Sequence, residues 1–117
     1  MELGGNDPFV VLEDGDVDLA ISEAVKWRCV NAGQVCTAPK RFIIHKNHYD
    51  KFKEGLIDGL KKIKWGNPLD REIQMGPLAR EDLYNNLEEQ LKNLPESYKI
   101  IYQREDMKKP FFPITVI

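Results

Sequence analysis

The chain has 117 residues, enough for one hydrophobic core of ordinary size and too few for two. Its 42% hydrophobic and 31% charged residues are typical of a globular protein and exclude a disordered or fibrous one. The 17 basic and 19 acidic residues leave a net charge of −2, so no strong field favours nucleic acid or an anionic membrane, and neither is expected as a partner.

The first strand is predicted at residues 9–12, a short apolar run that an acidic turn follows. Apolar residues three and four apart then predict an amphipathic helix that starts at Val17 and fades near Val30. Asp16 or Asp18 can cap this helix, because a carboxylate accepts hydrogen bonds from the free backbone N–H groups of the first turn.

A second strand is predicted at residues 41–45, which are rich in β-branched and aromatic side chains. A second helix follows from Tyr49 to Lys64, with Asn47 as its expected N-cap.

The second half of the chain has a less regular pattern. A polar loop is expected at residues 66–77, and a third helix at residues 79–94 with leucines along one side. Strands are predicted at residues 98–102 and 111–117, with a hairpin or surface loop at residues 103–109 between them.

Strands that alternate with helices predict an α/β fold with a mostly parallel sheet flanked by helices, since a helix is the usual crossover between parallel strands. Both ends of the chain look cut. The sequence starts directly at a glycine-rich motif, and its last seven residues are strongly apolar. We therefore expect residues 1–117 to be one segment of a longer protein.

The two cysteines, Cys29 and Cys36, are too few for a disulfide scaffold and match no zinc pattern, so the reducing cytoplasm is the simplest compartment. Taken alone, each is more simply a small buried hydrophobic residue than a reactive group. Gly33 and Lys40 lie close to Cys36 in the sequence, and such a loop would also suit a nucleophile. Glu2, beside a glycine pair, could be a general base or an ordinary solvated carboxylate.

Glu2 and Cys36 each lie in a motif, and the two motifs together resemble those of a known family. The motifs E-L-G-G-x-x-P at residues 2–8 and G-Q-x-C-T at residues 33–37 resemble the paired signature of the NAD(P)-dependent aldehyde dehydrogenase superfamily. Glu2 and Cys36 are 34 residues apart (36 − 2), which is also the family's interval between general base and catalytic cysteine. The family's other motifs are similar to residues 66–70, 75–78 and 111–116, so the resemblance covers essentially the whole chain.

Within the superfamily, residues 6–9, 31–36 and 40–43 look most like the succinate-semialdehyde dehydrogenase branch. The resemblance implies that Cys36 is the nucleophile and Glu2 the base that activates the hydrolytic water. It also implies that Leu3 and Gly4 contact the cofactor, NAD or NADP. The family's cofactor domain lies outside this sequence, so the chain would be a partial catalytic domain that is inactive by itself.

Three alternatives stay open. The longer protein could oxidise succinate semialdehyde or another aliphatic or amino aldehyde, or the segment could be a non-catalytic α/β interaction module. The family usually forms dimers or tetramers, and a small aldehyde is the expected ligand. No metal is expected, because no carboxylate or cysteine near His45 and His48 completes a set of ligands.

Overall fold

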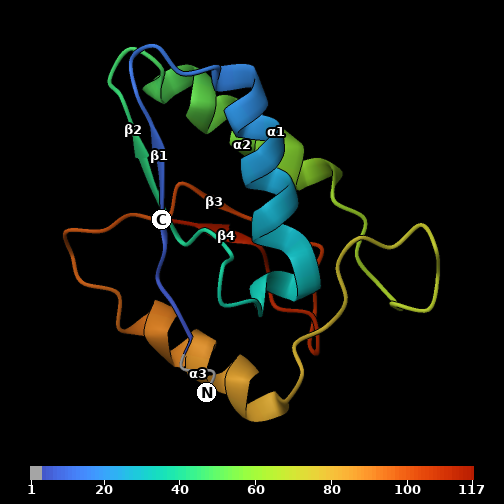
Figure 1. The fold of residues 1–117 in the computed structure, drawn as a ribbon. Coiled ribbons are helices and arrows are strands. Elements are labelled where there is room, and N and C mark those ends of the chain that lie inside the picture. Colours follow the sequence, from blue (N-terminus) through green and yellow to red (C-terminus); the bar gives the residue numbers. More distant parts are fainter. Residues whose placement is uncertain (1–3) are drawn as a thin grey trace. The chain divides into compact units, whose positions relative to one another are not determined.

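The computed structural model describes residues 4–117 (Figure 1). The chain divides into two compact units, Met1–Lys64 and Trp65–Ile117. The first unit contains the two parallel strands with the two longest helices, and the second contains one helix and a short antiparallel strand pair.

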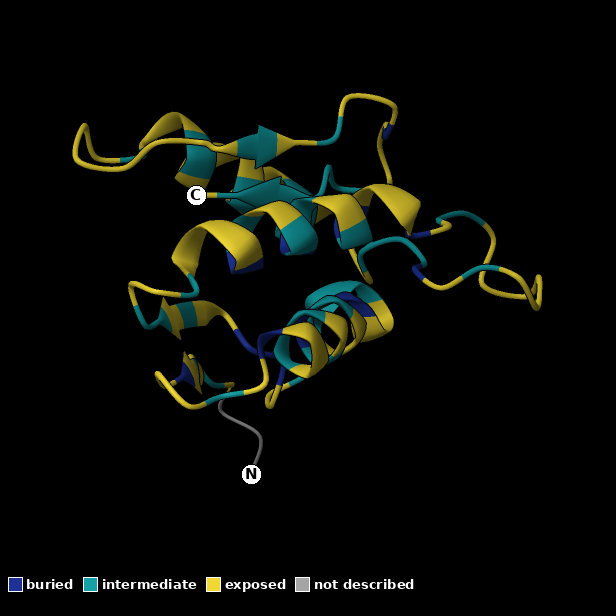
Figure 2. Ribbon diagram, turned by 90° about the horizontal axis from the view of Figure 1, so that it is seen from above, coloured by how far each residue is buried: buried dark blue, intermediate teal, exposed yellow. Residues whose placement is uncertain are grey.

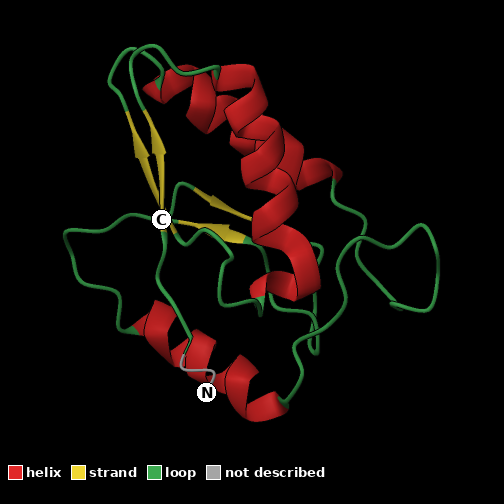
Figure 3. Cartoon of the chain, in the orientation of Figure 1, coloured by secondary structure: helices red, strands yellow, loops and turns green. Residues whose placement is uncertain are grey.

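Two strands and a crossover helix form the framework of the first unit. Strand β1 (Pro8–Val11) pairs in parallel with β2 (Arg41–Ile44), and Pro8 lies opposite Arg41 in the register. Helix α1 (Val17–Cys29) belongs to the connection between the strands, as parallel pairing requires (Figure 3). The predicted strand–helix–strand order and the α/β class are confirmed.

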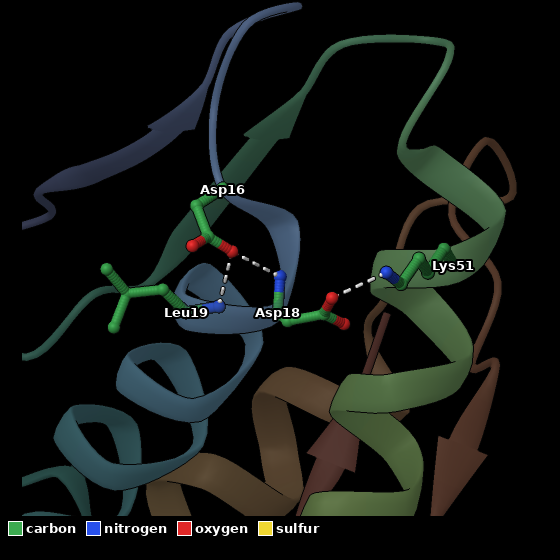
Figure 4. Close-up of polar contacts among 4 residues, drawn as sticks. All are labelled: Asp16, Asp18, Leu19 and Lys51. Atoms are coloured by element: carbon green, nitrogen blue, oxygen red, sulfur yellow. Dashed lines mark hydrogen bonds and ion pairs between the residues drawn. The ribbon is translucent and has the colours of Figure 1, made fainter.

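Helix α1 starts where the acidic residues predict. The Asp16 carboxylate accepts hydrogen bonds from the backbone N–H groups of Asp18 and Leu19, at 3.1 and 3.0 Å (Figure 4). Asp18 instead pairs with Lys51 of the following helix, at 2.8 Å. Asp16 is therefore the N-cap, and Asp18 joins the two helices at the surface.

Helix α2 (Tyr49–Lys62) begins as predicted, but its expected cap is wrong. His48 occupies the N-cap position and makes no capping hydrogen bond through its side chain. The Asn47 side chain donates instead to the Glu13 carboxylate at 3.0 Å. The Asn47 side chain thus links the turn before α2 to the turn after β1 by a hydrogen bond.

The core of the first unit lies between the strands and the helices. The ring centroids of Phe9 and Phe42 lie 6.3 and 5.7 Å from that of Phe52, so α2 packs on one face of the strand pair. Figure 2 shows buried and exposed residues on different sides of the helices. The buried residues of the two helices are Val17, Ala24, Cys29, Phe52, Leu56 and Leu60.

The second unit is built around helix α3 (Glu81–Lys92) and the antiparallel strands β3 (Tyr102–Gln103) and β4 (Thr115–Val116). The leucine stripe of α3 is half-buried, as its spacing predicts. The predicted strand at residues 98–102 is wrong except at Tyr102, and the one at 111–117 shrinks to two residues. Aromatic packing replaces pairing there, because the Phe111 ring lies 5.0 Å from that of Trp65.

Among residues 4–117, no helix is long and apolar enough to cross a membrane.

Candidate active site

The two sequence motifs meet because each directly precedes a strand of the parallel pair. Glu2 and Leu3 lie outside the described residues, so the candidate base and one candidate cofactor contact have no observed position. Glu2 is six residues before Pro8, Cys36 is five before Arg41, and these two strand residues are partners in the register. Parallel pairing therefore brings the motifs to the same end of the strands.

The backbone of the glycine motif lies directly against the cysteine. A Cβ atom built on Gly5 would lie 2.7 Å from the carbonyl oxygen of Cys36, closer than real Cβ atoms approach. Gly5 thus permits a contact that any side chain would prevent. The neighbouring Gly4 is exposed with φ +74°, and a Cβ atom there would meet no atom of residues 6–117 within 4 Å.

Two cations join the cysteine motif to the segment before β1. Lys40 Nζ donates a hydrogen bond to the carbonyl oxygen of Gly5. Arg41 donates from Nε and Nη2 to the carbonyl oxygen of Asn6, at 3.2 and 3.0 Å. The Lys40 amide continues the ladder to the Asp7 carbonyl at 3.3 Å. The sequence places Lys40 near the thiol but does not reveal these hydrogen bonds, since they depend on the strand register.

Cys36 itself is exposed and carries a free thiol, whereas Cys29 is buried in α1. The buried interpretation that Cys36 would receive in isolation is therefore wrong, and that of Cys29 is confirmed. Cys36 follows Val35 in a tight turn closed by the Ala38 amide, which donates to the Val35 carbonyl at 3.1 Å. An exposed thiol on a hydrogen-bonded turn is accessible to a small electrophile.

The chain reaches this turn through an unusual bend. After α1, Asn31 (φ 49°) and Ala32 (φ 55°) adopt left-handed backbone conformations, and Gly33 follows at φ 75°. Gln34 closes the bend, because its amide and its side-chain Nε2 both donate to the Asn31 carbonyl, at 3.1 and 2.9 Å. No sequence signal marked Asn31 and Ala32 as left-handed, apart from the glycine beside them.

Arg28 lies under this bend. A Cβ atom on Gly33 would lie 2.7 Å from Nη2, 2.8 Å from Cζ and 3.0 Å from Nη1 of Arg28. Burial lowers the pKa of the Arg28 guanidinium from its ordinary value, while the neighbouring Cys29 thiol acts in the opposite direction. No sequence signal marks Arg28 as a contact of this bend.

His45 and His48 lie in the turn before α2. His48 Nε2 lies 2.8 Å from the Glu13 carbonyl oxygen, and the His45 and His48 ring centroids are 6.5 Å apart. Within the described part of the chain, no group of three or more histidine, cysteine or acidic side chains could hold a metal ion.

The chain is similar to known proteins along nearly its whole length. The family model described as aldehyde dehydrogenase family matches residues 1–116. The Escherichia coli (strain K12) protein named as the NAD(P)+ succinate semialdehyde dehydrogenase Sad is 41% identical over 120 aligned residues, covering 100% of this chain and 26% of its own length. The chain thus spans about a quarter of that curated relative.

Two solved structures are similar to the model. A succinate-semialdehyde dehydrogenase from Burkholderia pseudomallei gives a TM-score of 0.85 at 31% identity, covering 97% of this chain and 24% of that structure. A betaine aldehyde dehydrogenase from Staphylococcus aureus in complex with NAD+ gives a TM-score of 0.87 at 34% identity, covering the same shares, 97% and 24%.

Proposed function

Because this chain belongs to the aldehyde dehydrogenase family, we propose that it is the catalytic segment of a longer dehydrogenase, which oxidises an aldehyde to the carboxylic acid. The carrying observation is the contact of the Gly5 backbone with the Cys36 carbonyl, at the shared end of β1 and β2. Glu2 lies three residues before Gly5 in the sequence. A base and a thiol on two motifs that meet suit formation and hydrolysis of an acyl-enzyme.

In this proposal Cys36 is the nucleophile. Its thiolate attacks the aldehyde carbon, and the backbone N–H of Cys36 donates to the oxyanion that develops. Loss of a hydride from the resulting thiohemiacetal to NAD or NADP would leave a thioester on Cys36, and Glu2 takes a proton from the water that hydrolyses it. The exposed position of the Cys36 thiol supports the first step, since the aldehyde must reach the sulfur.

The open backbone of Gly4 supports a cofactor beside the cysteine. A flat ring could approach there, because no atom of residues 6–117 lies within 4 Å of the Cβ position. Leu3 and Gly4 would contact the nicotinamide of NAD or NADP, which supplies a hydride acceptor when bound. The sequence of this segment does not distinguish the two cofactors.

Succinate semialdehyde is the favoured substrate, since the Escherichia coli relative carries that name and the segment shares that branch's motif residues. Another aliphatic or amino aldehyde is the second candidate, supported by the similarity to the betaine aldehyde dehydrogenase structure. We further propose that the complete enzyme is a cytoplasmic homodimer or homotetramer, and that residues 1–117 alone do not turn over substrate. A non-catalytic α/β interaction module is the alternative from another class.

The test uses the complete dehydrogenase with Cys36→Ser and, as a matched control, Cys29→Ser. The proposal predicts that Cys36→Ser abolishes NAD(P)-linked aldehyde oxidation, whereas Cys29→Ser retains catalysis in the fraction that folds. Full oxidation by the Cys36→Ser enzyme would refute the mechanism. A panel of aldehydes compared by kcat/KM then separates succinate semialdehyde from its competitors, because specificity is the ratio of these constants.

A further inference from the structure

The bend between α1 and the cysteine turn has an unfavourable backbone. Asn31, Ala32 and Gly33 have φ values of 49°, 55° and 75°, so three successive residues are left-handed. Residues with a Cβ atom rarely adopt this conformation, because the Cβ atom crowds the carbonyl oxygen that follows. Strained backbone of this kind persists only when its surroundings hold it in place.

The bend continues directly from α1 as a short 3-10 helix, Val30–Gly33, and hydrogen bonds between its residues close it. Asn31 Nδ2 donates to the Gln34 carbonyl at 3.4 Å, and Gln34 Nε2 donates to the Asn31 carbonyl at 2.9 Å. The Arg28 side chain packs against Gly33 of the bend. Because a Cβ atom on Gly33 would be about equally far from Nη2, Cζ and Nη1 of Arg28, the flat face of the guanidinium must point at the Gly33 α-carbon.

The Arg28 guanidinium contacts Gly33 by packing rather than by a hydrogen bond from Nη1. Its Nη1 atom is buried and has no hydrogen-bond partner among residues 4–117. A buried donor without a partner is unfavourable. The packing of the flat guanidinium face on Gly33 offsets that cost. The side chain fills the space that a side chain at residue 33 would take.

We propose that Arg28 is a positioning residue for Cys36. Its guanidinium packs against Gly33 and so stabilises the bend. Cys36 follows Gly33 by three residues, so the conformation of the bend determines where its thiol lies. Lys40 and Arg41 hold the other end of the same loop against the segment before β1. The inference rests on the proposed function in one respect, namely that Cys36 is the nucleophile whose position matters.

The experiment compares four forms of the 117-residue chain with wild type: Arg28→Ala, Gly33→Ala, their double variant, and Lys26→Ala as the control. Lys26 is a cation of the same helix, but its exposed side chain lies 4.0 Å from Glu23 rather than under the bend. Two quantities are measured. One is the rate of Cys36 alkylation by iodoacetamide in the folded chain divided by that in urea, with the site assigned by fragmentation mass spectrometry. The other is the set of backbone chemical shifts of Asn31 and Ala32, which report positive φ.

The expected results follow from the geometry. Arg28→Ala lowers the rate ratio by about fivefold or more, because a displaced thiol loses its preorganised surroundings. It also moves the Asn31 and Ala32 shifts away from left-handed values, whereas Lys26→Ala changes neither quantity. Gly33→Ala strains the backbone in both backgrounds because φ is +75°, but it is less harmful beside Arg28→Ala, since removal of the guanidinium leaves room for the new methyl group.

The outcomes separate this inference from the proposed function. A wild-type rate ratio of one or less would count against an activated Cys36 and thus against the proposed function, while the chemical shifts would still decide the role of Arg28. Unchanged shifts in the Arg28→Ala chain, or effects of Arg28→Ala and Gly33→Ala that simply add, would overturn the positioning role. A general loss of α1 stability would give additive effects and is therefore told apart.

Discussion

The contact between Gly5 and Cys36 gives the sharpest structural prediction. In Gly5→Ala the new methyl carbon would lie 2.7 Å from the Cys36 carbonyl oxygen and 3.4 Å from Oδ1 of Asp7. Carbon and oxygen atoms in ordinary contact are about 3.3 Å apart, so one of the two segments must move by about 0.6 Å. The clashing atom is a backbone carbonyl oxygen, so the clash cannot be relieved by rotation of a side chain.

The cost follows from overpacking. Forcing an extra carbon into a filled site destabilises proteins by about 1–3 kcal/mol. Gly5 itself has no positive φ to strain an alanine, and at an unstrained open position the same change would instead stabilise by about 0.4–1 kcal/mol. The sign of the effect therefore tests whether the contact exists. A shift of the Cys36 backbone by this amount should also lower kcat of the complete enzyme by about tenfold.

Urea unfolding of the 117-residue chain measures the free energy, and steady-state kinetics of the complete dehydrogenase measure kcat. Gly4→Ala is the matched control: at φ +74° it strains the backbone by about 1–2 kcal/mol, but its methyl group meets no atom of residues 6–117 within 4 Å. Both variants should lose stability, whereas only Gly5→Ala should displace Cys36. The Cys36 alkylation rate in the folded 117-residue chain reports that displacement, because kcat of Gly4→Ala also depends on the proposed cofactor contact. A Gly5→Ala chain as stable as wild type, with unchanged kcat, would refute the reasoning.

Three further changes test the first unit. Asp16→Ala removes the α1 cap and should cost about 1 kcal/mol in urea unfolding, whereas Asp14→Ala in the preceding turn should cost nearly nothing; equal losses would contradict the cap. Arg41→Met removes two hydrogen bonds to the segment before β1, so exchange of the Lys40 amide should speed up about fivefold, and an unchanged rate would show that the tether is ineffective. Phe52→Ala empties a position that is 3% exposed and should cost about 3–5 kcal/mol, enough to abolish cooperative unfolding.

Local patterns were sufficient to predict the first unit. The run at residues 9–12, the helical spacing after Asp16 and the aromatic strand at residues 41–45 each have one reasonable interpretation, and the structure confirms them within a residue or two. The predicted N-cap of α2 was wrong, because the Asn47 side chain donates a hydrogen bond to the Glu13 carboxylate instead. Competition of that kind depends on tertiary contacts, which a local rule cannot include.

The second unit was harder to predict for a related reason. Residues 98–102 and 111–117 have strand-like composition, but Phe111 packs on Trp65, and Pro113 cannot donate to a ladder. Only two residue pairs remain in β3 and β4. Composition indicated where strands could form, while aromatic packing determined where they stop.

The candidate site divides in the same way. Motif resemblance was enough to propose Cys36 and Glu2 as nucleophile and base, because their spacing and neighbours match the family's motifs. The supporting contacts could not be predicted, since the tether from Arg41 requires the register of β1 and β2, and Arg28 reaches Gly33 only through the left-handed bend. These contacts exist only once the fold has formed.

The most direct test of the central claim is to trap the acyl-enzyme in the complete dehydrogenase. In a Glu2→Gln variant mixed with NAD(P) and aldehyde, hydrolysis should be slowed more than acylation, because the base that activates water is lost. We expect a burst of reduced cofactor of about one equivalent and, by mass spectrometry, an acyl group on Cys36. An acyl group on Cys29, or turnover at the wild-type rate without any adduct, would contradict the assignment of Cys36 as nucleophile and Glu2 as base.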